Sequence, residues 1–421
     1  MAIGGATLLA GAAVAGTARP TSTRALDDVV HLNQIQVIGS HNSYHEPVTG
    51  KEYQLRHAFL GNADQAFMYR ADPLATQLQS DKVRQIELDT WLDPVGGRYA
   101  TPLLRKLAGL GPYDPAMNKP GIKIIHVQDV DYHVNCLTLV LCLGQVKAWS
   151  HAHPTHVPLA ILIELKDSEL HVGNLPIVQP IPWTSAGLDT LDNEIRSVFS
   201  PADLITPDDV RGASPTLSGA VTTTGWPTLA QSRGKVLFLM DNGGHYRTDY
   251  LAGHPSLKGR ILFTNANPGD DDAAFVERNT STDPSIPTLV KAGYVVRTRA
   301  DEPTDTARKN DTSLRDAGLA SGAQWVSTDY PRPGLDVGFN TPYFAEIPGG
   351  TVARCNPVNG PPSCVSAQLD TNFTPLPVPT TTTTTSITPT STVPATTTVP
   401  DEGTEPAAGA TPVPGRSSFT G

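Results

Sequence analysis

Short apolar runs recur along the middle of the chain, and most of them end in polar residues before a loop or a helix-like segment. Eight runs have the length of strands: residues 34–38, 83–91, 122–127, 159–165, 235–240, 260–263, 294–299 and 324–328. Several are almost continuously apolar, which is typical of parallel strands that are covered on both faces. Eight such strands over about 300 residues predict an α/β fold, a TIM-like (β/α)8 barrel.

Helical patterns fill some of the gaps between these runs. Residues 188–198 place their apolar side chains on one face of a helix, and residues 135–149 are apolar all round. The connection after the fourth run is long and rich in Pro, Ser and Thr. We therefore expect the barrel to be distorted rather than regular.

The composition changes at both ends of the chain. Residues 1–20 are small and apolar, which resembles a secretory signal that lacks its basic start; an ordinary N-terminal helix is the alternative. From Thr371 onward a Thr/Pro tract has few large apolar side chains, so it is expected to stay extended and solvated. We divide the chain into a disordered N-terminal extension (1–30), one barrel (31–370) and a disordered low-complexity tail (371–421).

Charge and cysteine content narrow the class of protein. With 31 basic and 41 acidic residues the net charge is 31 − 41 = −10, which argues against a nucleic-acid partner and against a polybasic hold on lipid. The four cysteines form two short-spaced pairs, Cys136 with Cys142 and Cys355 with Cys364. Disulfides in an oxidising compartment are the preferred interpretation, over a zinc site or free thiols. We expect a secreted or cell-surface protein that acts as a monomer.

Polar side chains gather where the first four runs end, which is the end of a parallel barrel at which active sites form. They are His41 and Asn42 after the first run, Glu87 and Asp89 on one face of the second, His126 in the third, and Glu164 and Lys166 at the end of the fourth. Each alone has a structural explanation, as a hydrogen-bonded histidine or a solvated carboxylate. Their convergence in apolar contexts, where an unpaired charge is costly, favours a single site.

The chemistry of this set indicates phosphodiester cleavage. Asn42, Glu87, Asp89 and Glu164 offer only oxygen ligands, which favours a hard cation, Ca²⁺ before Mg²⁺, over zinc. The two histidines are then free for proton transfer near neutral pH. One metal, one base and one acid are the parts that such a reaction needs.

At these residues the chain resembles the calcium-dependent phosphatidylinositol-specific phospholipase C family of bacterial type, within the PLC-like phosphodiesterase superfamily. The resemblance runs from about residue 33 to 333 and is carried by GSHNSYH, RQIELDTW, IIHVQD with CLTLVLCLGQVKAWS, HPTHVPLAILIELKD, ITPDDVRG, GWPTLAQSRGKVLF and WVSTDYP. It implies that His41 and His126 are the catalytic pair. It also implies Ca²⁺ ligands at Asn42, Glu87, Asp89 and Glu164.

The resemblance further implies a substrate and a reaction course. The substrate would be phosphatidylinositol, reached at a membrane surface in transient contacts. Its inositol 2-hydroxyl would attack the 1-phosphate with help from His41, and His126 would protonate the departing glycerol oxygen. Diacylglycerol would leave, and a cyclic inositol phosphate would form before hydrolysis.

Several basic and acidic residues are candidates for substrate contacts. Lys166 and Arg299 are expected to bind phosphate or inositol hydroxyls, with ion pairs as the structural alternative. Further candidates are Arg297, Asp241 and Asp329, at the ends of the seventh, fifth and eighth runs.

Two other functions compete with this interpretation. A glycerophosphodiester phosphodiesterase shares the Glu-x-Asp pattern, but its opening motif is His-Arg-Gly where this chain has His41-Asn42-Ser43, and its second histidine follows the Glu-x-Asp more closely than the 126 − 89 = 37 residues found here. The other alternative is a surface-displayed binding protein without catalysis. Residues 46–72 are either a lid or interfacial loop, or a segment whose aromatic side chains pack against the barrel.

Overall fold

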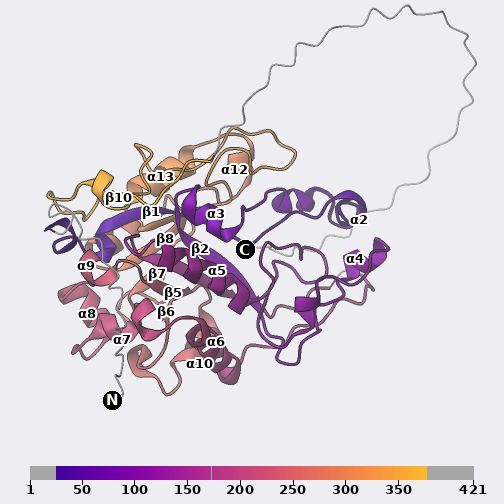
Figure 1. The fold of residues 1–421 in the computed structure, drawn as a ribbon, viewed down its shortest axis with the longest axis horizontal. Coiled ribbons are helices and arrows are strands. Elements are labelled where there is room, and N and C mark those ends of the chain that lie inside the picture. The colour runs from indigo at the N-terminus through magenta and orange to yellow at the C-terminus, as the bar shows by residue number, and fades with distance from the viewer. Residues whose placement is uncertain (1–24, 172, 377–421) are drawn as a thin grey trace, which may run out of the picture. The chain divides into compact units, whose positions relative to one another are not determined.

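The computed structural model describes residues 25–171 and 173–376. Its sheet follows the order β6–β5–β4–β2–β1–β9–β8–β7, with parallel pairing between neighbours. A parallel bridge between Asn265 and Phe275 links the two ends, so the barrel is nearly closed (Figure 1). This confirms the predicted TIM-like fold. The eight strands are β1 (Ile35–Ser40), β2 (Val83–Trp91), β4 (Leu159–Leu165), β5 (Val236–Met240), β6 (Leu262–Thr264), β7 (Phe275–Glu277), β8 (Val295–Arg299) and β9 (Trp325–Thr328).

Helices surround this barrel, and the two longest match the predicted helical patterns. In α6 (Ser185–Val198) the Thr184 side chain caps the first turn by accepting from the Gly187 amide, and one face of the helix is buried. α5 (Leu139–Ala152) begins after Thr138, four residues later than the apolar pattern indicated. The other helices are α2 (Gly50–Leu60), α3 (Leu74–Gln79), α4 (Leu103–Leu107), α7 (Pro207–Arg211), α8 (Leu217–Thr223), α9 (Leu229–Ser232), α10 (Gly244–Leu251), α11 (Ile286–Lys291), α12 (Asp305–Arg308) and α13 (Ser313–Ser321).

Short 3₁₀ turns complete the described elements: η1 (Leu32–Gln34), η2 (Gly61–Phe67), η3 (Pro115–Asn118), η4 (Pro201–Asp203), η5 (Pro255–Leu257) and η6 (Ser366–Gln368). Among the described residues, no helix combines the length and apolar character needed to cross a bilayer.

The centre of the barrel explains why the apolar runs are so regular. β4 pairs with β2 on one side and β5 on the other, and its aliphatic side chains are buried on both faces. The register sets Asp89 of β2 directly beside Glu164 of β4. Two acidic side chains at the carboxyl ends of adjacent strands are thereby fixed by backbone pairing alone.

The predicted third strand is wrong. Of residues 122–127 only Lys123 and Ile124 form a strand, β3 (Lys123–Ile124), and it pairs antiparallel with the end of β2, outside the parallel path. The barrel strand that replaces it in the count is β7, whose three residues are too short to stand out as a run. A further strand, β10 (Ala353–Cys355), adds antiparallel to β1 and was also missed, because its sequence, Ala-Arg-Cys, is not apolar.

Both predicted disulfides are present, Cys136–Cys142 and Cys355–Cys364. The first joins the loop before α5 to that helix, and the second closes the loop that follows β10. The signal-like residues 1–20, and all of the Thr/Pro tail from residue 377 onward, lie outside the described residues.

Candidate active site and metal centre

His41 follows β1 and is held at one ring nitrogen. Its Nδ1 donates to Oδ1 of Asp329 at 2.6 Å, and Asp329 follows β9, the strand beside β1. Its Nε2 lies 3.5 Å from Oε1 of Glu87 and is buried without a hydrogen bond to any described residue. Burial, with the charges of Arg299 and Arg297, holds the pKa of His41 well below its ordinary value. The ring is therefore neutral, with its Nε2 lone pair free to take a proton.

His126 lies in the loop after β3 and is held in a similar way. Its Nδ1 donates to Oδ2 of Asp131 at 2.7 Å, and the same oxygen accepts from Nε2 of His45 at 2.8 Å. The Arg56 guanidinium binds the other oxygen of Asp131. Burial alone would raise the pKa of Asp131, but these three partners keep it well below its ordinary value. Asp131 is thus a permanent anion behind His126, whose own pKa is lowered by burial.

Tyr69 connects the two histidine groups. Its ring stacks on His45 at a centroid distance of 4.3 Å. Its hydroxyl accepts a hydrogen bond from Nδ2 of Asn42 at 2.8 Å. The position of His45, and through it Asp131, is therefore tied to the residue that directly follows His41.

Three carboxylates form an acidic cluster between these groups. Glu87 and Asp89 of β2 and Glu164 of β4 each place an oxygen within 4.8 Å of the other two. Burial raises the pKa of Glu87 to about 7 and that of Asp89 well above its ordinary value, and the neighbouring carboxylates add to both effects. Crowded buried carboxylates of this kind are stabilised by a cation.

The residues of the cluster fit a hard divalent cation. Neither oxygen of Asp89 makes a hydrogen bond within the described part of the chain, although both are buried. The Lys166 ammonium lies 3.1 Å from Asp89 and 2.6 Å from Glu164, so it neutralises part of the acidic charge. Three crowded carboxylates, with one ammonium shared between two of them, offer the oxygen ligands that Ca²⁺ prefers.

The side-chain oxygen of Asn42 is linked to this cluster through Tyr44. That oxygen accepts from the Tyr44 hydroxyl at 3.0 Å, and burial and the charge of Asp89 raise the pKa of Tyr44. An amide oxygen has two lone pairs, so one remains for a metal. The backbone at Asn42 has φ of 43°, a left-handed conformation that Asn tolerates better than most residues.

Two of the remaining candidates, Arg299 and Arg297, form buried ion pairs close to His41 and the acidic cluster. Arg299 contacts Asp301 at 3.1 Å and Asp329 at 3.4 Å, so it supports the carboxylate that holds His41. Arg297 binds Glu87 and contacts Glu277 at 2.6 Å. Burial and Glu277 raise the pKa of Asp241 well above its ordinary value. Substrate contacts by Lys166 and Arg299 stay predictions, beside the ion pairs that both residues make.

Sequence reasoning missed Asp131 and His45 as members of the site. Asp131 lies only five residues after His126, and His45 lies within the GSHNSYH motif, four residues after His41. In both cases the short distance in sequence from a predicted catalytic histidine was the available signal. It was hidden because residues 122–127 were interpreted as a barrel strand, whereas the chain turns back at this point and bridges Val127 to Asp131.

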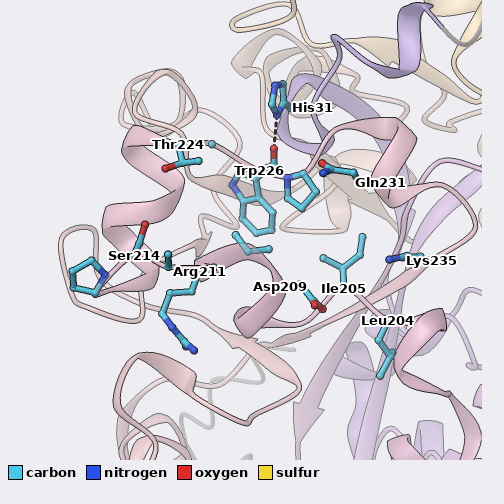
Figure 2. A pocket seen from close by; sticks show the side chains of 16 residues that line it. His31, Leu204, Ile205, Asp209, Arg211, Ser214, Thr224, Trp226, Gln231 and Lys235 are labelled. Carbon is cyan, nitrogen blue, oxygen red and sulfur yellow. Dashed lines mark hydrogen bonds between the residues drawn. The ribbon is translucent and has the colours of Figure 1, made fainter.

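A cavity of about 960 Å³ lies elsewhere in the described part of the chain (Figure 2). Its wall includes His31, which precedes β1, and Lys235, which precedes β5, so it lies at the amino ends of the strands. None of the candidate site residues lines it. The His31 ring forms a hydrogen bond with the Trp226 carbonyl, and Arg211 forms an ion pair with Asp208.

A family model and solved structures show which known proteins the chain is similar to. A family model described as "Phosphoinositide phospholipase C, Ca2+-dependent" matches residues 30–357. The chain is similar to a solved calcium-dependent phosphoinositol-specific phospholipase C from Pseudomonas sp. (18% identity, TM-score 0.48, 78% of this chain and 96% of that chain covered). It is also similar to a Ca²⁺-dependent phosphatidylinositol-specific phospholipase C from Streptomyces antibioticus (18% identity, TM-score 0.44, 72% and 96% covered). No curated protein sequence gives a match.

Proposed function

Because the chain belongs to the Ca²⁺-dependent phosphoinositide phospholipase C family, and is therefore a phosphoric diester hydrolase, we propose that it cleaves phosphatidylinositol by acid–base catalysis between His41 and His126. The observation that carries this proposal is the pair of histidine–carboxylate contacts. Each imidazole is held at Nδ1 by an aspartate, at 2.6 Å for His41 and 2.7 Å for His126, which leaves each Nε2 for proton transfer.

The roles of the two histidines follow from their surroundings. His41 is neutral and its free Nε2 faces the acidic cluster, so it takes the proton of the attacking inositol 2-hydroxyl. His126 has the anionic Asp131 behind it, which stabilises an imidazolium, so it gives a proton to the departing glycerol oxygen. The 2-hydroxyl attacks phosphorus as the glycerol oxygen leaves, so the first product is a cyclic inositol phosphate.

Asn42, Glu87, Asp89 and Glu164 would hold Ca²⁺ in this proposal. When bound, the ion neutralises phosphoryl oxygens and makes the 2-hydroxyl easier to ionise. Lys166 stays beside Asp89 and Glu164, where its ammonium is available to a phosphate oxygen.

Product analysis tests the proposed reaction. Purified protein is incubated with phosphatidylinositol vesicles, with CaCl₂ or with EGTA, and the water-soluble products are identified by ³¹P NMR. We expect a cyclic inositol phosphate that forms with CaCl₂ and not with EGTA. Hydrolysis of soluble glycerophosphoinositol to glycerol phosphate and inositol, without a cyclic product from phosphatidylinositol, would instead indicate a glycerophosphodiester phosphodiesterase. Absence of any cleavage would favour the binding protein.

Asp131 and His45 are proposed as positioning residues for His126, and their substitutions should shift the pH profile in opposite directions. Since the acid must be protonated, activity falls as pH rises through the pKa of His126. Asp131→Asn removes the anion, so this basic limb moves to lower pH and kcat falls by at least about 10²-fold. His45→Gln removes a competing donor to Asp131, so the limb moves to higher pH.

The measurement is the pH dependence of kcat with phosphatidylinositol. Asp311→Asn, on an exposed side chain, is the control and should leave the profile unchanged. Shifts in the same direction for Asp131→Asn and His45→Gln would contradict the positioning role.

We further propose that the protein acts outside the cell as a monomer. The two disulfides support an oxidising compartment. Cell fractionation and light scattering of the purified protein test the two statements.

A further inference from the structure

Three large apolar side chains are exposed at helices α2 and α4, on a surface that we name the α2–α4 lip. They are Phe59 of α2 (42% exposed), and Leu107 (40%) and Leu110 (46%) at and after the end of α4. α2 and α4 pack against each other and lie on the same side of the barrel (Figure 1). A narrow apolar groove between them is lined by Phe59, Leu60, Leu104 and Leu107. Of the aromatic residues in segment 46–72, Phe67 and Tyr69 are buried, so Phe59 is not exposed merely because the whole segment is loose.

The two segments that carry these side chains have exposed basic residues and no exposed acidic residue, although the chain as a whole carries −10. In residues 47–70 the two acidic side chains, Glu52 and Asp64, are buried, and residues 94–113 contain no acidic residue. The nearest exposed carboxylates along the chain, Glu46 and Asp114, flank these two segments. The exposed lysine and arginine side chains of the two segments are Lys51, Arg70, Arg98 and Lys106. Exposed apolar side chains with exposed lysines on the same two helices are the pattern of a surface that meets anionic lipid.

This lip adjoins the candidate active site. Arg56 of α2 binds Asp131, and the Phe67 ring lies 5.3 Å from the His126 ring. On the other side, Asp129 of the same catalytic loop accepts from the Leu103 amide at the start of α4, at 2.8 Å. The loop that carries His126 therefore connects directly to both helices of the lip.

We propose that the α2–α4 lip, defined by Phe59, Leu107, Leu110, Lys51 and Lys106, is the surface with which the protein docks onto an anionic lipid bilayer. This inference rests on the proposed function, because a bilayer substrate keeps its acyl chains in the membrane while its headgroup enters the mouth beside the lip. Phe59, Leu107 and Leu110 enter the headgroup region, and the two lysines face anionic lipid. The lip thereby sets how often the site meets substrate, not how fast it reacts.

Vesicle binding tests the lip independently of catalysis. The triple variant Phe59→Ser, Leu107→Ser, Leu110→Ser is compared with the wild-type chain by sedimentation with vesicles of phosphatidylcholine and phosphatidylserine in equal parts, in EGTA. We expect its partition coefficient to fall by about tenfold or more. Lys51→Gln with Lys106→Gln should remove most of the dependence on phosphatidylserine and on salt. The control variant Val29→Ser, Val365→Ser changes two exposed apolar residues away from α2 and α4 and should bind like wild type.

Activity on two forms of substrate completes the test. On phosphatidylinositol vesicles the triple variant should lose activity in proportion to binding, while its kcat/KM on monomeric dibutanoyl phosphatidylinositol stays within about twofold of wild type, since a surface role leaves the chemistry intact. Unchanged vesicle binding, or equal losses on both substrates, would overturn the proposal. A wild-type chain that binds vesicles through the lip but cleaves neither substrate would contradict the proposed function and leave the lip standing. Wild-type protein that binds no vesicles would contradict the lip alone.

Discussion

Replacing His41 or His126 by Gln should lower kcat for phosphatidylinositol by about 10²- to 10⁴-fold, the usual contribution of a positioned acid or base. His41→Gln removes the Nε2 lone pair that faces Glu87. The variant therefore lacks the acceptor for the 2-hydroxyl proton. His126→Gln removes the donor to the leaving oxygen. Gln is chosen because it retains a polar side chain of similar size beside Asp329 or Asp131.

The two substitutions should differ when the leaving group is changed. With a substrate whose leaving group is a good one, such as a p-nitrophenyl ester of inositol phosphate, the departing oxygen needs no proton. His126→Gln should then regain most of its lost rate, whereas His41→Gln should not, because attack by the 2-hydroxyl is still required. The double variant should cost little more than the worse single variant, since both residues act on the same step.

Initial rates on both substrates are the measurement, and circular dichroism checks that each variant is folded. His171→Gln is the matched control, because this side chain is 73% exposed and pairs only with the exposed Glu169 among the described residues. If both single variants cleave phosphatidylinositol at wild-type rates, the assignment of the two histidines is wrong.

The parts of the site that the sequence predicted are those set by strand ends. Glu87 and Asp89 project from the same face of β2 because side chains alternate along a strand, and parallel pairing brings Glu164 beside them. His41 and Asn42 follow β1 at once, so their position also depends only on local sequence. The alternation of side chains along a strand, and the position of each residue at the end of an apolar run, were enough to predict where these residues lie.

The carboxylates that hold the histidines depend on contacts that a run of residues does not encode. Asp329 reaches His41 across 288 positions of sequence, because β9 closes the barrel beside β1. Asp131 reaches His126 because the chain reverses after β3, where an apolar stretch, Ile-Ile-His-Val, looked like a continuing strand. In both cases a tertiary contact, absent from local periodicity, decides which carboxylate serves which imidazole.

Asp89→Asn should strongly weaken Ca²⁺ binding and yet stabilise the metal-free protein at high pH. Asp89 is fully buried beside Glu87 and Glu164, and the ammonium nearest to it, that of Lys166 at 3.1 Å, is shared with Glu164. Its carboxylate therefore contributes charge to a cation and repulsion in the absence of one. We expect a loss of at least about 100-fold in Ca²⁺ affinity by isothermal titration calorimetry, since a ligand of a hard cation contributes through its charge.

The stability of the metal-free protein and its affinity for Ca²⁺ should change in opposite directions as the pH rises. Because burial raises the pKa of Glu87 to about 7 and that of Asp89 above its ordinary value, the folded, metal-free state holds these protons more tightly than the unfolded chain does. Stability is then fully present at low pH and declines as pH rises from the ordinary carboxylate range toward about 7. Ca²⁺ needs the ionised forms, so its affinity should rise over the same interval.

Thermal unfolding in EGTA and in CaCl₂, at pH 5 and pH 8, tests the predicted effects on Ca²⁺ binding and on the stability of the metal-free protein. For the wild-type chain the gain in Tm from CaCl₂ should be larger at pH 8 than at pH 5, because metal binding then displaces fewer protons and relieves more repulsion. For Asp89→Asn the gain should vanish, while Tm in EGTA at pH 8 should equal or exceed that of wild type. Asp311→Asn should reproduce the wild-type pattern. A metal-free variant that is less stable than wild type at both pH values, with Ca²⁺ affinity retained, would show that Asp89 supports the fold and not a metal. Lower Ca²⁺ affinity together with higher stability of the metal-free Asp89→Asn variant would show that this carboxylate destabilises the metal-free protein and serves to bind the cation.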